Sequence, residues 1–423
     1  MSARVPARIA LLGAGNRGGD VYGRLAAERP ELVRVVALAD PRSERRRVVG
    51  DALGVEEARR YGAWAALLAD VGAGALALDA VVIATPDADH VESAEAALAL
   101  DLDLLLEKPI ASDAAGVARV ERAAAASRGR VSVAHVLRHE PLFARLEAGL
   151  RAGAVGRLVG IDHVEHVGHW HFAHSYVRGA WRREADASPM LLAKACHDLD
   201  LLRWLVGERC ERVASSGALH HFHEGAAPSG APARCLDGCP VEPECPYSAP
   251  RIYLGRYGAR PEWPNLVLDP MPTPERIRQA LETGPYGRCV YRCDNDVVDH
   301  QVVLLDFVGG VRVSLTVSAF TAEITRTVRA WGTHGEVSGH MGRGELLWRD
   351  FRDGSERREA LGAAGDAHAG ADRTFALDWF ERIAGRREGA AATELAASLE
   401  SHRMAFAAER ARHAGTWERP ESV

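Results

Sequence analysis

The sequence predicts an α/β protein with two domains, a doubly wound parallel sheet followed by an α+β domain. The chain has 423 residues, 47% of them hydrophobic, which is ample for two cores and too long for one ordinary domain. Over the first 130 residues, short apolar runs alternate with helix-length segments, which indicates parallel strands joined by right-handed crossovers. Beyond about residue 150, longer strands follow one another closely, which favours antiparallel pairing.

The composition excludes several classes of protein. With a formal net charge of -6, the chain is neither a disordered polyelectrolyte nor a strongly basic nucleic-acid binder. Its first residues lack the long apolar stretch and small-residue cleavage site of a secretory signal, and no run approaches the roughly 20 apolar residues of a membrane helix. We therefore expect a cytoplasmic protein that binds neither nucleic acid nor a membrane.

The first domain, placed at residues 1–135, is expected to be a Rossmann sheet. A helix should follow the glycine-rich segment after the first strand, and a second helix should cover Ala94–Leu100. The expected strands are Arg8–Leu12, Leu32–Ala39, Ala80–Ala84, Asp103–Leu106 and Val131–His135.

The second domain, placed at residues 136–423, is expected to carry a large, mostly antiparallel, open sheet. Gly309-Gly310 lies between two strand patterns and predicts a hairpin turn. Residues 222–285 hold 12 of the 20 prolines, so we expect an irregular insertion there. The expected strands are Leu158–Val167, Val298–Phe307, Val311–Ala319 and Arg326–Trp331, and the expected helices are Met190–Leu205, Arg373–Ile383 and Thr393–His413, the last two closing this domain at about 373–413.

The glycine-rich segment is the first functional signal. Gly13, Gly15 and Gly18 fit G-x-G-x-x-G between a strand and a helix, where the glycines allow a tight turn and close approach of a pyrophosphate to the helix start. Asp40 lies 22 residues beyond Gly18, at the end of the next strand, where a carboxylate would take the ribose hydroxyls and repel a 2′-phosphate. The pattern therefore predicts NAD, while Arg42 keeps NADP open. The alternative is a glycine-rich turn that binds no nucleotide.

Two further loops follow the third and fourth strands, at the edge where ligands of such sheets bind. A lysine beside a bound nicotinamide can take or give the proton of a substrate hydroxyl, so Lys108 is a candidate general acid or base. The alternative is a surface lysine paired with Glu107. The residues of these loops expected at the cofactor are Thr85, Pro86, His90, Glu107 and Lys108.

Together these motifs resemble the Gfo/Idh/MocA oxidoreductases, the glucose–fructose oxidoreductase and inositol dehydrogenase relatives. The resemblance rests on the glycine segment with Asn16 and Arg17, on Ala84-Thr-Pro, on Glu107-Lys-Pro and on a later helix with His197-Asp-Leu-Asp. It implies NAD(P)-dependent oxidation or reduction of a sugar, glycoside or cyclitol hydroxyl, with Lys108 as acid or base and His197 assisting. It also implies a homo-oligomer, a dimer or tetramer, built on the second sheet.

The chain departs from the family pattern four residues before His197, where many relatives have an aspartate. Here Ala193 occupies that position, and Lys194 follows it on the same helical face as His197 and Asp198. Lys194 could hold a substrate oxygen or compete with Lys108 as base; alternatively it pairs with Asp198 while His197 merely packs. The change leaves room for an NAD-retaining glycosidase or lyase that works by transient oxidation and elimination. A non-catalytic nucleotide-binding protein is the third reading.

A segment rich in histidine and aromatic residues precedes this helix. If the segment is extended, His169 and His171 point the same way and could bind a metal. Aromatic faces and arginines suit a sugar equally well, and we prefer a substrate pocket or a subunit contact.

Three cysteines lie close together in the proline-rich insertion. Cys235, Cys239 and Cys245 form C-x3-C-x5-C in a stretch with little apolar material of its own. Thiolates on a structural zinc ion would order it, with a fourth ligand from Cys289, Cys293 or the histidines at 220–223. The alternative is a set of unliganded thiols.

Overall fold

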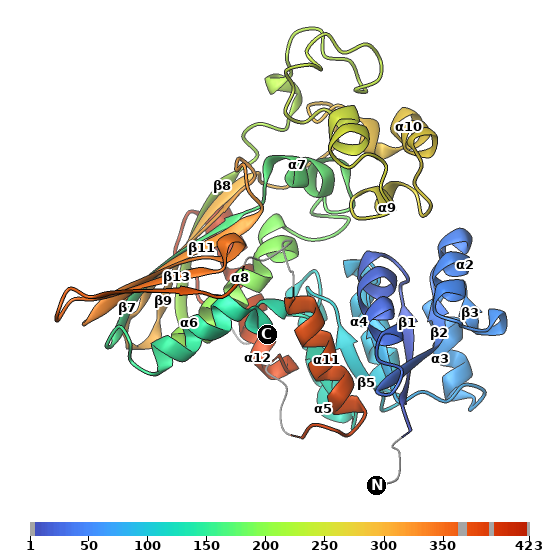
Figure 1. Cartoon of the computed structure of the whole chain (residues 1–423), viewed down its shortest axis with the longest axis horizontal. Helices are drawn as coiled ribbons and strands as arrows, with labels where there is room; N and C mark the ends of the chain where they lie inside the picture. Colours follow the sequence, from blue (N-terminus) through green and yellow to red (C-terminus); the bar gives the residue numbers. More distant parts are fainter. Residues whose placement is uncertain (1–4, 363–369, 389–392, 421–423) are drawn as a thin grey trace. The chain divides into compact units, whose positions relative to one another are not determined.

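The computed structural model describes residues 5–362, 370–388 and 393–420, shown in Figure 1. They form two compact units. The first contains the described residues up to His139 and those of Gly370–His402, and the second begins at Glu140 and takes up the chain again from Arg403. Each unit has one sheet.

The first unit is built on a six-stranded sheet with the order β3-β2-β1-β4-β5-β6. All its strand pairs in the described chain are parallel, which confirms the predicted doubly wound sheet. The order reverses between β1 and β4, and ligands of such sheets bind where the order reverses. The strands are β1 (Ala7–Leu12), β2 (Val33–Ala39), β3 (Arg60–Tyr61), β4 (Ala80–Ile83), β5 (Asp103–Leu106) and β6 (Val131–Val133).

One helix of this unit comes from far along the chain. Phe375, Trp379 and Phe380 of α11 are buried in the same apolar core as Ile9 and Leu11 of β1, and α11, coloured red in Figure 1, lies beside the blue and cyan elements. The sequence placed this helix in the second domain; its packing assigns it to the first unit. The helices are α1 (Arg24–Ala27, after a π-helical turn at Asn16–Gly23), α2 (Ser43–Ala52), α3 (Trp64–Gly72), α4 (His90–Leu98), α5 (Ala114–Ala126) and α11 (Ala371–Ile383).

The second unit is built on an eight-stranded sheet with the order β14-β13-β12-β11-β7-β10-β9-β8. Among the described strands, β7 and β10 pair in parallel and the remaining neighbours are antiparallel, which confirms the predicted sheet. Gly309 and Gly310, at φ 82° and 89°, turn the chain between β9 and β10 as expected. The strands are β7 (Leu158–His166), β8 (Cys210–Ala218), β9 (His300–Phe307), β10 (Arg312–Ser318), β11 (Thr325–Gly332), β12 (Gly335–His340), β13 (Glu345–Asp350) and β14 (Glu356–Ala360).

Helices cover one face of this sheet. The helix α6 (Pro141–Arg151) packs on β13, while α8 (Met190–Val206) packs on β7 and β10, and nearly every residue of α8 is buried. The remaining helices of the described chain are α7 (His169–Phe172), α9 (Asn265–Leu268), α10 (Pro274–Thr283) and α12 (Leu395–Ala414).

The proline-rich insertion is more ordered than its composition predicted. Pro274 begins α10, and the Thr273 hydroxyl accepts a hydrogen bond from the Arg276 amide, so this proline starts a helix instead of interrupting one. Tyr253 and Ile277 help to form a small apolar core there. The expected irregular insertion therefore contains a regular helix at α10, because a proline at a helix start is compatible with the helix.

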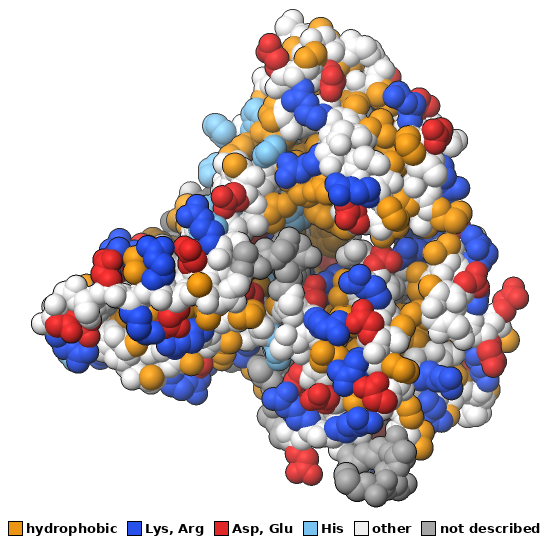
Figure 2. All heavy atoms as spheres, in the orientation of Figure 1, with side chains coloured by type: hydrophobic (Ala, Val, Ile, Leu, Met, Phe, Trp, Pro, Cys, Tyr) orange, Lys and Arg blue, Asp and Glu red, His pale blue; other side chains and the backbone are white. Residues whose placement is uncertain are grey.

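Charged side chains of both signs are interspersed on the face of the molecule drawn in Figure 2. That distribution agrees with the small net charge and shows no extended basic surface on this face. Within the described ranges, the helices are too short or too polar to cross a bilayer.

Candidate active site

The glycine turn has the geometry that the motif predicts. Gly13 has φ 91°, and its amide donates to the Ala39 carbonyl at 2.8 Å. A Cβ at Gly13 would lie 2.3 Å from the Ala84 carbonyl oxygen, and one at Gly18 would lie 1.9 Å from the Gly13 carbonyl oxygen. Both positions therefore require glycine, and the turn holds β1 close to β4 at the point where the strand order reverses.

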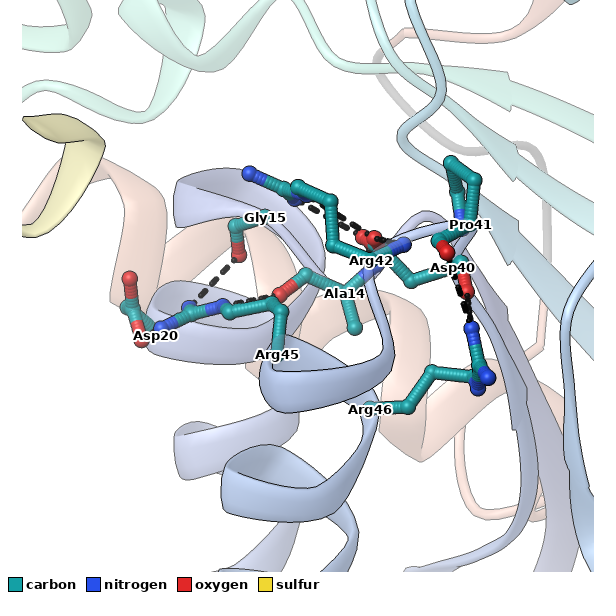
Figure 3. Close-up of polar contacts among 8 residues, drawn as sticks. All are labelled: Ala14, Gly15, Asp20, Asp40, Pro41, Arg42, Arg45 and Arg46. Atoms are coloured by element: carbon teal, nitrogen blue, oxygen red, sulfur yellow. Dashed lines mark hydrogen bonds and ion pairs between the residues drawn. The ribbon is translucent and has the colours of Figure 1, made fainter. Parts of the chain in front are cut away.

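Asp40, at the end of β2, is a buried carboxylate whose oxygens are fully engaged. The Arg42 amide and Nε donate to Oδ1 at 3.0 and 2.9 Å, while the Ala14 amide and Arg42 Nη2 donate to Oδ2 at 3.0 and 2.8 Å (Figure 3). Burial works to raise the pKa of Asp40, but the hydrogen bonds and charge of Arg42, with the Ala14 amide, lower it overall. The group is thus held ionised beside the glycine turn.

Two further arginines donate hydrogen bonds to the backbone around Asp40, and they were not predicted from the sequence. Arg45 Nε donates to the Ala14 carbonyl at 2.6 Å, and Arg46 Nη1 donates to the Asp40 carbonyl at 2.6 Å (Figure 3). Both lie on α2, which begins three residues after Asp40. Arginines one turn into the helix that follows the acidic residue are the signal that could have revealed them.

Arg17 lies in a buried network of charges. Its Nε donates to Glu107 Oε1 at 2.6 Å, its guanidinium is paired with Asp372 of α11 at 2.8 Å, and the Tyr22 hydroxyl also donates to Glu107 at 2.8 Å. Burial works to raise the pKa of Glu107, and the charges of Arg17 and Lys108 lower it overall. Glu107 thus holds Arg17 in place. Asp372 belongs to the same network, but no local sequence motif identifies it.

The loops after β4 and β5 are tied together by His90. Its ring nitrogens lie 2.6 Å from the Pro109 carbonyl oxygen and 3.1 Å from the Thr85 carbonyl oxygen. The Lys108–Pro109 peptide bond is cis, and the Lys108 amide donates to Glu107 Oε2 at 3.2 Å. The Thr85 hydroxyl is buried and makes no hydrogen bond with the described residues.

These features of the first unit fit an anionic dinucleotide. The glycine turn leaves room for a pyrophosphate at the start of a helix, an ionised carboxylate suits ribose hydroxyls, and the Thr85 hydroxyl has bonding capacity to spare.

In the second unit, α8 carries the other candidate residues. Lys194 and His197 are buried, and Lys194 Nζ lies 3.2 Å from Glu165 Oε1 on β7. Burial lowers the pKa of Lys194, although the charge of Glu165 acts to raise it. The partner of Lys194 is thus Glu165, whereas the sequence offered Asp198 as the alternative.

Asp198 belongs to the same buried network, because Arg326 Nε also lies 2.7 Å from Glu165 Oε2. Arg326 Nε donates to Asp198 Oδ1 at 2.8 Å, and His163 Nε2 lies 2.8 Å from the same atom. Burial works to raise the pKa of Asp198, but the charge of Arg326 and the His163 contact lower it overall. His163 and Glu165 occupy inward positions of β7, and two polar residues on the buried face of a strand are a signal that could have identified this network.

The histidine-rich segment differs from the expectation. His169 and His171 lie in α7, so the extended conformation that would point them the same way is wrong. His169 Nδ1 lies 3.2 Å from the Thr321 carbonyl oxygen, and the His171 ring packs on Trp263 at 5.0 Å between centroids. Trp170 and Phe172, which alternate with the two histidines, are buried.

The insertion cysteines share a cavity. As the side chains stand, the described chain contains no group of three or more His, Cys, Asp or Glu residues that could hold a metal ion. The side-chain placement therefore does not by itself support the expected zinc at Cys235, Cys239 and Cys245.

Lysine is rare in this chain, and its positions bear on the site. The chain has 52 basic residues, and only Lys108 and Lys194 among them are lysines. A guanidinium does not give up its proton in a protein, whereas an amine can. Both of the chain's lysines are thus candidate site residues, a signal that a simple count would have found.

Comparison with known proteins agrees with this geometry. Residues 7–135 match the family described as "Oxidoreductase family, NAD-binding Rossmann fold", and residues 143–243 match the "GFO/IDH/MocA C-terminal domain". The chain belongs to the Gfo/Idh/MocA family. The family resemblance predicted from the sequence is thereby confirmed, together with the NAD-binding character of the first unit.

Relatives within the family match part of the chain. Inositol 2-dehydrogenase 4 of Saccharopolyspora erythraea is 32% identical over 240 residues, covering 53% of this chain and 60% of the relative. The inositol 2-dehydrogenase of Acidothermus cellulolyticus is 33% identical over 210 residues, covering 49% and 55%. The chain thus spans little more than half the length of the curated relatives it matches.

Solved structures match over nearly the whole chain. A levoglucosan dehydrogenase in complex with NADH and levoglucosan has a TM-score of 0.72 at 18% identity, covering 98% of this chain and all of the other. An oxidoreductase from Agrobacterium radiobacter in complex with NAD+, L-tartaric acid and magnesium has a TM-score of 0.68 at 18% identity, covering 98% of each chain. At this identity the likeness shows the fold.

Proposed function

We propose that the chain is an NAD-dependent dehydrogenase that oxidises or reduces a hydroxyl-bearing carbon of a sugar, glycoside or cyclitol. The observation that carries the proposal is the restriction of lysine to two positions, Lys108 beside the cofactor loops and Lys194 one turn before His197. As hydride leaves, a base must take the proton of the alcohol. Such a base has to be available in its deprotonated form, which an amine can reach and a guanidinium cannot.

The cofactor would be held by the first unit. Gly13 and Gly15 would face the pyrophosphate, Asp40 the ribose, and Thr85 the remaining polar groups. When bound, NAD supplies the ring that accepts or returns the hydride. The other expected contacts are Asn16, Arg17, Pro86, His90 and Glu107; of these, Arg17 and Glu107 also bind each other.

Lys108 is proposed as the general acid or base. Its side chain follows β5 at the carboxyl edge of the parallel sheet, and the paired loops around His90 fix its backbone. Its amine would take the hydroxyl proton during oxidation and return it during reduction.

His197 and Lys194 are proposed to act on the substrate oxygen. His197 would donate a hydrogen bond to it, and Lys194 would hold or protonate it. The lowered pKa of Lys194 supports this role, because it makes proton exchange near neutral pH easier than for an exposed lysine. Many relatives have an aspartate at the position of Ala193. In this chain Glu165, which contacts Lys194, would supply the carboxylate of the site instead.

The substrate class is inferred from the relatives. Those named above are inositol 2-dehydrogenases, and a structural neighbour is a levoglucosan dehydrogenase. Both substrates present secondary hydroxyls on a six-membered ring, so we infer a cyclic polyol or pyranose for this chain.

The test is turnover by purified protein stripped of its cofactor. NAD and a panel of cyclitols, sugars and glycosides should give reduced nicotinamide, followed by its absorbance, with at least one ring polyol. Cleavage of a glycoside without net reduction would favour the NAD-retaining glycosidase or lyase instead. Tight NAD binding without any turnover across the panel would contradict the dehydrogenase.

A further inference from the structure

Four cysteines from two separate segments line one cavity in the second unit. Cys235, Cys239 and Cys245 come from the insertion, and Cys289 comes from the segment just before β9. The sequence had left Cys289 as one of several candidates for a place beside the other three.

Backbone pairing brings the two segments together. The Cys235 amide donates to the Gly287 carbonyl at 3.0 Å, and the Cys289 amide donates to the Ala233 carbonyl at 2.9 Å, so the segments form a short antiparallel pair. Side chains two residues apart along such a pair point to the same face. Cys235 and Cys289 are therefore diagonal neighbours facing the cavity.

The cavity has room for one small occupant. Its volume of about 20 Å³ exceeds the roughly 10–15 Å³ that a single water-sized species needs. An organic cofactor or a multi-iron cluster is too large for it. Four thiols around a space of this size match the donor set of one soft metal ion.

Arg178, on the cavity wall, is a buried charge in need of compensation. Its side chain is 1% exposed, and its guanidinium donates to the Arg288 and Tyr247 carbonyls at 2.7 and 2.8 Å and lies 3.7 Å from Cys235 Sγ. Nη1 has no hydrogen-bond partner, and no carboxylate pairs with this guanidinium within the described ranges. A buried cation normally has an anion nearby, because desolvating it alone is costly.

We propose that Cys235, Cys239, Cys245 and Cys289 bind one divalent, thiophilic metal ion of the zinc type, with Arg178 as its counter-charge. Binding breaks four S–H bonds, forms four metal–sulfur bonds and releases four protons to solvent, without change of oxidation state. The resulting centre carries a net negative charge next to Arg178. With four thiolate ligands it has no open position, so its role is structural.

Binding requires the thiols to converge. In the present side-chain positions, the described chain has no set of three that could hold a metal ion. Cysteine has a single side-chain torsion with three staggered positions, so the proposal requires the sulfurs to turn toward the cavity about this torsion. The bound ion would join the insertion to the segment before β9.

Cys293 supplies the matched control. It lies four residues beyond Cys289, but it is not among the residues that line the cavity, and its thiol donates to the Cys289 carbonyl. The proposal therefore separates two neighbouring cysteines of the same segment.

The experiment measures zinc in the full chain after incubation with excess zinc salt and gel filtration. About one zinc per chain is expected in the unmodified protein and in Cys293→Ser, with a loss of most of it in Cys239→Ser and in Cys289→Ser. X-ray absorption of the loaded protein should show four sulfur neighbours at about 2.3 Å.

Unmodified protein that retains less than about a tenth of an equivalent would overturn the proposal, as would oxygen or nitrogen in place of sulfur in the absorption spectrum. Equal zinc in Cys289→Ser and Cys293→Ser would overturn the assignment of Cys289. Because a variant could fail to fold, cobalt is added to the metal-free unmodified chain as a second measurement. A sulfur-to-cobalt charge-transfer band supports a thiolate site, and its absence contradicts one.

Discussion

Arg42 and Asp40 together decide how the site can treat the adenosine ribose. Four hydrogen bonds fill the acceptor positions of Asp40, so ribose hydroxyls can reach this carboxylate only if the Arg42 side chain moves. That side chain is 58% exposed and free to turn toward solvent, where it could equally meet a 2′-phosphate. The pair is therefore compatible with NAD and also offers a cation for NADP.

Replacing Arg42 should separate the two cofactors. In Arg42→Ala we expect NADP affinity to fall by about tenfold or more, since one charge-assisted contact is lost, while NAD affinity changes little or rises. Calorimetric titration with each dinucleotide measures this. Arg47→Ala, on the same helix and paired with Asp51 at 3.5 Å, is the control and should leave both affinities unchanged. Parallel losses for both dinucleotides in Arg42→Ala would refute the explanation.

Lys108 allows a test of proton transfer apart from charge. Lys108→Ala and Lys108→Arg should both lower turnover, by about 10² to 10⁴, because neither side chain exchanges a proton as an amine does. NAD affinity should stay within a few-fold in both. Steady-state rates and equilibrium titration measure the two effects, and near-normal turnover in Lys108→Arg would assign the lysine an electrostatic role instead.

At this scale the sequence predicted positions better than partners. Gly13, Gly18 and Asp40 were assigned from spacing alone, because a motif that requires glycine or a carboxylate at a fixed backbone position can be recognised from the sequence. The arginine that saturates Asp40, and the Lys194–Glu165 pair, depend on side chains that meet in three dimensions.

At the scale of elements, the aromatic packing around α7 creates a buried, uncharged histidine. His174 follows α7, its Nδ1 lies 2.8 Å from the Tyr253 hydroxyl, and its ring stacks on Tyr286 at 4.8 Å between centroids. Burial lowers the pKa of His174 to about 3, with a further lowering from the charge of Arg178. The folded state therefore resists protonation of this ring.

The free energy of unfolding should depend on this histidine in mild acid. In an unfolded chain the ring titrates near pH 6.5, so between pH 6.5 and 3 the unfolded state binds more protons and stability falls as pH falls. From pH 6.5 to 5 the contribution is roughly 1.5–2 kcal/mol. His174→Phe should remove about that much of the pH dependence, measured by chemical denaturation at both pH values.

Tyr253→Phe provides the control for this prediction. It removes the hydroxyl that contacts His174 while leaving the titrating ring buried, so it should lower stability by about 1 kcal/mol equally at both pH values. An unchanged pH dependence in His174→Phe would show that other groups determine it.

Regular elements with simple periodicity could be predicted, and crowded aromatic segments could not. The hairpin at Gly309-Gly310 followed from two glycines between alternating strands. The helix at His169–Phe172 did not, because alternating histidines resemble a strand, and the buried Trp170 and Phe172 alternate with them in the same way.

On the scale of the whole molecule, the first unit depends on residues far along the chain. Phe380 of α11 is fully buried in the core beneath the parallel sheet, so Phe380→Ala should destabilise the protein by about 3–5 kcal/mol. Trp417→Ala, at a side chain that is 43% exposed, should cost no more than about 1 kcal/mol. Denaturation followed by circular dichroism compares the two, and similar losses would argue against the assignment of α11 to this core.

The two-sheet architecture was predictable because each sheet has its own strand pattern, and the family match confirms it. The unit to which α11 belongs was not predictable, because the sequence of an amphipathic helix does not show which core its apolar face packs against. Charged contacts such as Arg17 with Asp372, 355 residues apart, reveal the assignment only in the folded state.

The discontinuous first unit has a consequence for biosynthesis. Both units take their final segments from the last part of the chain, Gly370–His402 in one and the residues after Arg403 in the other. A nascent polypeptide halted near residue 360 would already contain the strands of both sheets, yet neither hydrophobic interior would be closed. The segments beyond residue 370 must therefore be synthesised before either core can close, and until then apolar surface of both sheets stays exposed.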